Sequence, residues 1–193
     1  MKRSDINFLI ESATRCFAQN RWALPPNPKW DVTDFGLGEW QAFGLVLVNL
    51  ANEPEYCEKI MYVRRGMTTP AHTHAKKKED IICRWGELTI TLWKGKPGGT
   101  RQDEFSVNVN GEPTQLRSGE SILLGPGERI TLMPGIYHEF VCSSEECIVG
   151  EISTANDDAN DNFFSNPKVG RFPEIVEDAP VIVKLIHEFS EPN

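Results

Sequence analysis

Hydrophobic and polar residues alternate in short runs through the middle of the chain, a pattern typical of half-buried β-strands. Turn-forming residues separate the runs, for example Asn110-Gly111, Ser118-Gly119 and Gly125-Pro126-Gly127. No helical pattern lies between them, so we expect an all-β fold, an antiparallel sandwich or barrel of the jelly-roll kind. The predicted strands are 43–50, 60–63, 81–83, 88–93, 105–109, 121–124, 130–133, 140–142 and 148–152.

The first residues follow a helical period instead. Residues 4–20 place apolar side chains on one face, and Ser4 is available as an N-cap. We therefore expect an N-terminal helix within 1–20 that packs on the outside of the sheets. The prolines of Leu24-Pro25-Pro26-Asn27-Pro28 forbid a continuing helix, so 21–40 is predicted to be an extended linker.

The barrel is expected to occupy 41–152, followed by a C-terminal loop and closing segment, 153–193. Residues 153–178 are polar and acidic, which indicates either an ordered loop or a loosely held excursion. The apolar run 181–186 could be a closing strand or a short helix, and periodicity does not decide between them. The whole chain, 1–193, is predicted to be a single domain.

The composition of the chain limits the kinds of partner that it is expected to bind. The chain has 193 residues, 39% of them hydrophobic, which suits one well-buried core. A net charge of −8 argues against nucleic acid and anionic membranes, which need a basic surface, and favours a small-molecule ligand. The five cysteines form no Cys-x-x-Cys pair, as expected for reduced thiols in a cytoplasmic protein, and Cys83 and Cys142 lie in runs predicted to be core.

Histidines and one carboxylate form a spaced pattern. His72 and His74 are two residues apart, so on an extended strand both imidazoles point to the same side. Glu79 follows after a turn, and His138 would arrive from a distant strand. Three imidazoles and one carboxylate suit manganese, iron, cobalt, nickel or zinc, and a six-coordinate ion would keep two positions open for a bidentate substrate.

The glycines around these ligands carry a family resemblance. The segment from Gly66 to Gly86 matches the first cupin motif at every spaced position, and the segment from Gly127 to His138 matches the second. In the second motif the pair Pro134-Gly135 is shifted from the usual Pro-x-Gly, but the distance from glycine to histidine is kept. The resemblance implies a small β-barrel with the metal inside it, that is, a cupin jelly roll with an N-terminal helix and an extended C-terminal tail.

Further segments, in order along nearly the whole chain, resemble the bacterial D-lyxose ketol-isomerase family. The resemblance implies a manganese-preferring homodimer that interconverts D-lyxose and D-xylulose, and often also D-mannose and D-fructose. Two departures leave the sugar preference open, namely the glycine-poor stretch after Glu79 and the small Thr73 between the paired histidines. The matching segments include Trp30-Asp31-Val32-Thr33-Asp34-Phe35-Gly36, Glu58-Lys59-Ile60-Met61, Pro134-Gly135-Ile136-Tyr137-His138, Gly150-Glu151-Ile152-Ser153 and Gly170-Arg171-Phe172-Pro173-Glu174-Ile175.

An isomerase of this kind needs a group that carries a proton between adjacent carbons. Glu151 stands in an apolar run, either at an exposed edge or aimed into a functional interior, where burial would raise its pKa. The resemblance adds Glu174 as an alternative base, if the tail folds over the barrel mouth, and Lys59 as a ligand of a sugar hydroxyl or of the enediolate oxygen. Asp34 could bind distal hydroxyls but is more typical of a turn.

Other polar residues have simpler interpretations. We expect Lys76, Lys77 and Lys78 to form a solvated loop, and His187 to be structural or exposed. Two other functions remain open. A cupin oxygenase would use the same ligands with iron, and a non-catalytic sugar-binding cupin would need a module that relays its signal, which the sequence does not contain.

Overall fold

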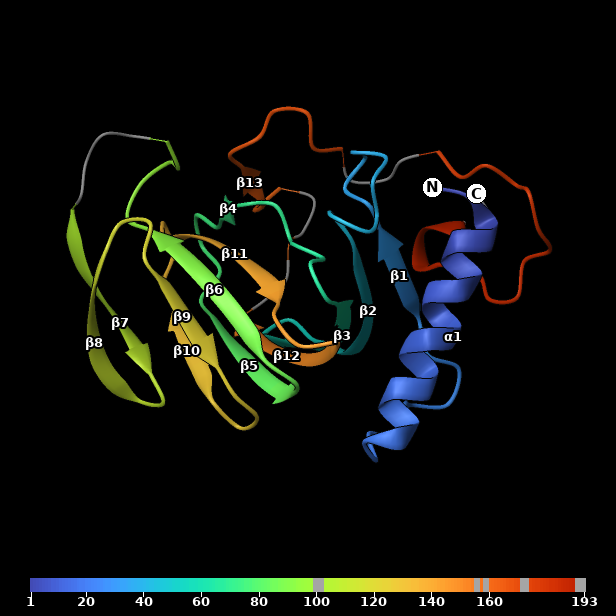
Figure 1. Cartoon of the computed structure of the whole chain (residues 1–193), viewed down its shortest axis with the longest axis horizontal. Helices are drawn as coiled ribbons and strands as arrows, with labels where there is room; N and C mark the ends of the chain where they lie inside the picture. Colours follow the sequence, from blue (N-terminus) through green and yellow to red (C-terminus); the bar gives the residue numbers. More distant parts are fainter. Residues whose placement is uncertain (99–102, 155–156, 158–159, 171–173, 190–193) are drawn as a thin grey trace.

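The computed structural model describes residues 1–98, 103–154, 157, 160–170 and 174–189. One α-helix is followed by strands and, near the end, by one short 3₁₀ helix (Figure 1). The elements are α1(Arg3–Gln19), β1(Trp30–Thr33), β2(Leu45–Asn52), β3(Tyr56–Arg64), β4(His72–Thr73), β5(Glu79–Trp85), β6(Leu88–Trp93), β7(Glu104–Val109), β8(Glu112–Arg117), β9(Ser121–Leu124), β10(Arg129–Leu132), β11(Tyr137–Cys142), β12(Glu146–Thr154), β13(Phe163–Phe164) and η1(Ile186–Glu188).

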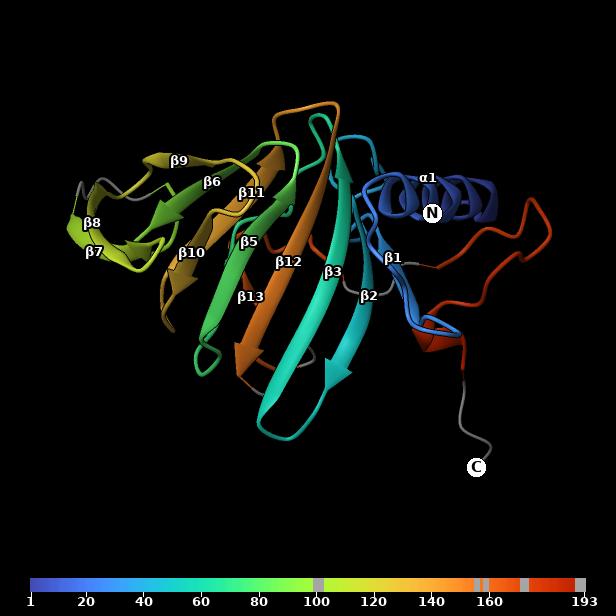
Figure 2. The same ribbon diagram turned by 90° about the horizontal axis from the view of Figure 1, so that it is seen from below.

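The strands form two antiparallel sheets. The larger has eight strands in the order β1-β2-β3-β12-β5-β10-β7-β8, and the smaller has five in the order β13-β4-β11-β6-β9. In Figure 1 the strands β6, β9 and β11 of the smaller sheet lie in front of β5, β10 and β12 of the larger one, and Figure 2 shows the larger sheet curving around them. Apolar side chains from both sheets fill the space between them, including Ile90, Leu92, Ile130, Leu132 and Phe140.

All the predicted strands are confirmed, with ends shifted by a few residues at most. β6 and β9 begin and end where the alternation predicts. Four further strands lie outside the predicted runs. β4 and β13 are only two residues long, and β8 is a mostly exposed edge strand with little apolar alternation.

The fourth, β1, corrects the prediction of a linker over 21–40. Trp30 and Val32 are buried, and the strand pairs antiparallel with β2. The prolines do keep this stretch out of regular secondary structure, but only up to the residue before Trp30. The larger sheet therefore begins inside the predicted linker.

Helix α1 begins at Arg3, one residue before the predicted start, and lies beside β1 at one end of the larger sheet in both views (Figures 1 and 2). Its predicted apolar face is confirmed, since Ile6, Leu9, Ile10, Ala13 and Phe17 are all buried. The prediction that Ser4 caps the helix is wrong. Lys2 occupies the cap position without a side-chain bond, and the backbone N–H and hydroxyl of Ser4 both donate to the carboxylate of Asp178.

The chain's two ends are held together by a cluster that we call the terminal clamp: Arg3, Glu177 and Glu188. The guanidinium of Arg3 is fully buried and donates to both carboxylates. The nearby run 181–186 is not a closing strand in the described residues, because only Leu185 makes a bridge, to Trp30, before η1 begins. Residues 155–156, 158–159, 171–173 and 190–193, which fall within the predicted C-terminal segment, lie outside the described residues.

The five cysteines are buried, and Cys83 and Cys142 are core residues as predicted. Within the described ranges, no helix has the length and apolar character that a membrane span requires.

Candidate active site

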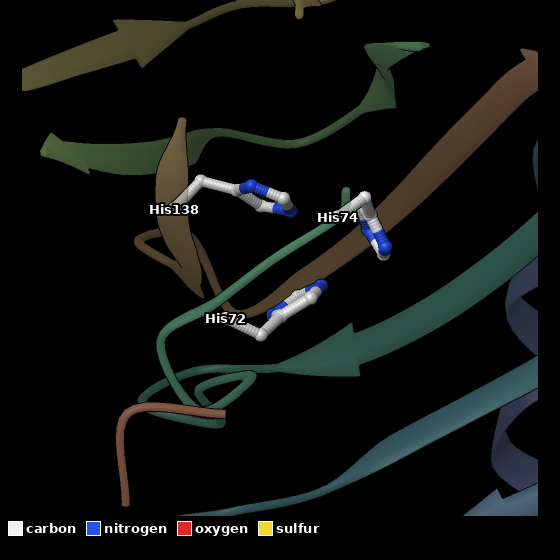
Figure 3. Close-up of side chains that lie close together, drawn as sticks. All are labelled: His72, His74 and His138. Atoms are coloured by element: carbon white, nitrogen blue, oxygen red, sulfur yellow. The ribbon is translucent and has the colours of Figure 1, made fainter. Parts of the chain in front are cut away.

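Three histidines converge between the two sheets. His72 lies on β4, His74 directly follows that strand, and His138 lies on β11 (Figure 3). One ring nitrogen from each lies within 4.8 Å of the others. The sequence prediction that these three residues meet is therefore confirmed, and their nitrogen atoms could hold a metal ion together.

Local backbone pairing brings the two motifs together. His72 is the direct partner of His138 in the ladder between β4 and β11. The turn before β11 reaches the same place, because the N–H of Gly135 donates to the carbonyl of His74 at 2.8 Å. Gly135 has φ of +86°, a conformation that glycine adopts without strain. The shifted Pro134-Gly135 pair thus forms the turn that joins the two motifs.

Each imidazole is oriented by the backbone. The Nδ1 atoms of His72, His74 and His138 lie 2.9, 2.6 and 3.3 Å from the carbonyl oxygens of Pro70, Asp161 and Ile136. A carbonyl only accepts, so Nδ1 carries the proton and the Nε2 lone pair is left for a ligand. Burial, and then His138 and His74, lower the pKa of His72 well below its ordinary value, which keeps that ring neutral.

Glu79, the first residue of β5, lies beside two of the histidines. Its Oε1 atom lies 3.0 Å from Nε2 of His138 and 3.3 Å from Nε2 of His74. With the histidine protons on Nδ1, these are lone-pair atoms facing one another. Among the residues that the structure describes, neither Glu79 Oε1 nor His74 Nε2 has a hydrogen-bond partner, and both atoms are buried. A cation between them would remove the conflict. The donor set therefore fits a divalent metal ion.

A cluster of buried charges adjoins these ligands, which we call the pocket cluster: Lys59, Lys77, Glu79 and Glu151. The ammonium of Lys77 lies 2.9 Å from Oε2 of Glu79 and 3.0 Å from Oε1 of Glu151, and that of Lys59 lies 3.2 Å from the same Oε1. All four side chains are buried. Glu151 on β12 is the direct partner of Lys59 on β3, so both project from the larger sheet.

The electrostatics of the pocket cluster favour the charged forms of Glu79 and Lys77. Burial raises the pKa of Glu79, but the ammonium of Lys77 and then the neighbouring imidazole of His138 outweigh it, so the pKa stays well below the usual value. Burial lowers the pKa of Lys77, but Glu151 and Glu79 outweigh this and raise it. Lys77 is therefore held as a cation between the side chains of Glu79 and Glu151.

The prediction of a solvated loop is thus wrong for Lys77, although its neighbours Lys76 and Lys78 are exposed as expected. The spacing of the residues contained a signal from which the position of Lys77 could have been predicted. Lys77 and Glu79 are two residues apart, as His72 and His74 are, and extended chain places such pairs on one side.

A pocket opens beside this cluster, and one wall of it is formed by His72. Lys59 and Glu151, predicted as catalytic, both line it, as does Lys77. Its remaining lining is largely apolar, with a few polar groups among the side chains: Asp31, Thr33, Phe35, Leu45, Leu47, Met61, Thr69, Phe140, Asn162 and Phe164. An apolar cavity with a few convergent polar groups is typical of a small-molecule site.

The other candidate residues lie elsewhere. Glu174 is exposed, and its backbone carbonyl accepts from the N-terminal amine of Met1. Asp34 is a turn former, as its sequence context suggested, because its Oδ1 accepts from the N–H of Gly36. His187 is exposed. The structure therefore brings Lys59 and Glu151 to the histidines but does not bring Glu174 there.

Two facing sheets with three histidines between them define a cupin. The family model of D-lyxose isomerase matches residues 27–189. The chain belongs to the D-lyxose isomerase family and is a sugar isomerase.

Relatives named as sugar isomerases match over most of the chain. The chain is 34% identical to the D-lyxose/D-mannose isomerase of Escherichia coli O157:H7, over 99% of each chain. It is 39% identical to the D-lyxose/D-mannose isomerase of Serratia proteamaculans, over 98% of each. The D-lyxose ketol-isomerase of Cohnella laeviribosi is 35% identical over 79% of this chain and 86% of its own.

Solved structures share the fold at lower identity. The L-ribose isomerase of Cellulomonas parahominis with L-psicose superposes with a TM-score of 0.69 at 17% identity, covering 91% of this chain and 98% of that one. The L-ribose isomerase of Acinetobacter sp. DL28 in complex with L-ribose gives a TM-score of 0.67 at 17% identity, with the same coverage. The cupin architecture predicted from the sequence is confirmed by these neighbours, although the hydrogen bonds of the described residues divide it into two sheets.

Proposed function

We propose that this protein is a metal-dependent aldose–ketose isomerase that interconverts D-lyxose and D-xylulose, and also D-mannose and D-fructose. The observation that carries the proposal is the pocket in which His72 and Glu151 face the same space. The names of the relatives from Escherichia coli and Serratia proteamaculans support the choice of sugars. Manganese as the ion and a homodimer as the assembly complete the proposal.

The residues that would hold the ion are His72, His74, Glu79 and His138. Nitrogen and carboxylate oxygen donors in this proportion suit manganese as well as its first-row neighbours. When bound, the ion supplies a Lewis acid for the two adjacent oxygens of the sugar. The protein's own side chains then have to carry a proton from C2 to C1, let the hydroxyl proton pass from the oxygen on C2 to the oxygen on C1, and stabilise the charge that appears.

Glu151 is the proposed base. It is buried in the pocket, and both lysines reach the same carboxylate oxygen, Oε1. Within the described part of the chain, no hydrogen bond reaches its second oxygen, Oε2. That oxygen would take the proton from C2 of the aldose and return it to C1, which gives the ketose. Lys59 and Lys77 hold the carboxylate in place as it works.

Lys59 has a second proposed task. Its ammonium lines the pocket beside Glu151, and it would donate to a sugar hydroxyl or to the oxygen of the enediolate. Asp31 and Thr33, which alternate with the buried Trp30 and Val32 on β1, line the same pocket and would contact the distal hydroxyls. They take the place that the sequence suggested for Asp34.

The test is turnover. Protein loaded with Mn²⁺ and incubated with D-lyxose should yield D-xylulose, measured by chromatography, and D-mannose should yield D-fructose. Dissolved oxygen should stay constant during the reaction, because isomerisation consumes none, whereas a cupin oxygenase would consume it. Retention of the metal without turnover of any pentose or hexose would contradict the proposal.

A further inference from the structure

The segment that follows β12 returns to the metal ligands and touches them from outside. Asp161, Asn162 and β13 lie in the part of the chain predicted only as a loop or a loosely held excursion. Here Asp161 is buried, and Asn162 and Phe164 line the pocket. This segment contacts the predicted metal ligands and the loop that carries Lys77.

Asp161 is bonded to the loop 74–77 at both its backbone and its side chain. Its carbonyl lies 2.6 Å from Nδ1 of His74. Its carboxylate accepts from three consecutive backbone N–H groups, at 2.8 Å from Ala75, 3.2 Å from Lys76 and 2.9 Å from Lys77. Bonds from successive N–H groups to an ionised carboxylate are strong and fix the backbone conformation.

The loop fixed in this way places two functional side chains. At one end, the ring of His74 is turned so that Nε2 points toward Glu79. At the other end, Lys77 leaves the backbone at the position from which its ammonium reaches both Glu79 and Glu151. One residue therefore contacts a predicted metal ligand through its carbonyl and, through its carboxylate, fixes the loop that carries the cation next to the proposed base.

The same segment also holds the other side of the site. Phe164 on β13 pairs with His72 on β4, and the two rings lie 5.3 Å apart between centroids. The N–H of Ser165 donates to the carbonyl of Ala71 at 2.8 Å. Residues 161–165 thus run along the ligand-bearing chain from Ala71 to Lys77.

We propose that Asp161 is a positioning residue for the metal centre: through its carbonyl it orients His74, and through its carboxylate it fixes the loop that carries Lys77. Asp161 touches neither ion nor sugar. Its effect is exerted through His74 and Lys77, so it sets the affinity for the ion and the placement of the base. The metal-binding part does not depend on which sugar the protein converts.

The experiment measures Mn²⁺ binding to metal-free protein by isothermal titration, without any sugar. Asp161→Ala should weaken binding about 10- to 100-fold, as for other residues that orient metal ligands. Asp161→Asn keeps an acceptor oxygen but loses the charge, so it should weaken binding less. The matched control is Asp157→Asn in the same segment, which should bind as the wild type does. Asp157 is an exposed carboxylate whose Oδ1, among the described residues, accepts from the backbone and side chain of Asn160.

Two further readouts separate positioning from a general loss of structure. Thermal unfolding of the metal-free variants should stay near that of the wild type. The visible spectrum of bound Co²⁺ should change in Asp161→Ala because, without the carboxylate, the loop 74–77 is no longer fixed against the backbone carbonyl that orients His74. With sugar, kcat should fall more than KM changes, since Lys77 is displaced. Wild-type affinity and an unchanged Co²⁺ spectrum in both Asp161 variants would overturn the inference, whatever the outcome of the turnover test.

Discussion

Arg3 and Lys77 are both buried cations between two glutamates, but the exposure of those glutamates and the roles of the two clusters differ. In the terminal clamp, the side chains of Glu177 and Glu188 remain 54% and 21% exposed, so water shares the charge. In the pocket cluster, Glu79 and Glu151 are 2% and 8% exposed. The clamp joins the two ends of the chain, whereas the pocket cluster is placed where chemistry can use it.

The second difference between the two clusters lies in the hydrogen bonding of their buried polar atoms. Arg3 donates to oxygens of both its glutamates, which stabilises the contact between helix and tail. Beside Lys77, the buried atoms Glu79 Oε1 and His74 Nε2 have no hydrogen-bond partner within the described part of the chain. Buried polar atoms without partners are costly, so a folded protein that keeps them has a use for them. The comparison predicts that changes in the pocket cluster abolish activity and that changes in the clamp affect only stability.

The largest effect is expected from the ligands. His72→Ala removes one of three nitrogen donors and should abolish detectable Mn²⁺ binding and lower kcat/KM by about 1000-fold or more, since a bound ion contributes several kcal/mol to such reactions. Metal content and D-lyxose turnover measure the two effects. His187→Ala, which changes an exposed histidine outside the site, should leave both unchanged.

The next largest effect distinguishes Glu151, the proposed base, from Glu174, the alternative suggested by the sequence. Glu151→Gln keeps the shape but removes the basic oxygen, so kcat should fall about 100- to 10,000-fold while Mn²⁺ binding persists. Glu174→Gln makes the same chemical change on the surface and should leave kcat unchanged. A reversed result, with activity lost only in Glu174→Gln, would show that the tail supplies the base.

Lys77→Met tests the cation itself. Without it, Glu79 and Glu151 remain buried near each other, and breaking such a pair costs about 3–5 kcal/mol. Urea unfolding should report a loss of free energy of unfolding of this order, together with lower turnover. Lys76→Met removes the same charge from an exposed neighbour and should change stability by no more than about 0.5 kcal/mol. Equal results for the two variants would end the distinction between the buried cluster and the solvated loop.

The smallest effect is expected in the terminal clamp. Hydrogen bonds from Arg3 lower the pKa of both Glu177 and Glu188, so their contribution to stability is present above the carboxyl pKa of the unfolded chain, about 4.3, and is lost as pH falls through the lower folded values. Arg3→Met should therefore destabilise the protein near neutral pH, and the difference from the wild type should shrink at pH below about 4. Urea unfolding at both pH values checks this, and turnover at neutral pH should persist.

Much of the fold could be predicted because the alternation of core strands such as β6 and β9 is strong over several residues. The strands β4 and β13 are too short to give a pattern, and they form because each lies against a partner that the rest of the fold supplies. The predicted cap at Ser4 is wrong for a similar reason. The helix start is set by a bridge between Lys2 and Val176 in the distant tail.

The residues of the site also divide into those that could be predicted from the sequence and those that could not. The convergence of His72, His74 and His138 could be predicted because ligand chemistry restricts both residue type and spacing. Glu79, predicted as the fourth ligand, lies next to two of them. Lys77 was hidden by the lysines on either side of it, which are solvated. Asp161 was hidden because it acts on His74 through its own carbonyl and on Lys77 through a backbone N–H, and neither contact leaves a mark in the sequence.

The most direct test is metal-dependent turnover of D-lyxose. Protein stripped with a chelator should convert no D-lyxose, and activity should return in proportion to added Mn²⁺, reaching its maximum at one ion per chain. D-Xylulose formed per minute is the quantity to measure, with bound metal determined on the same samples. Full turnover by the stripped protein, or none by the fully reloaded protein, would contradict the account of the pocket cluster as a metal-centred active site.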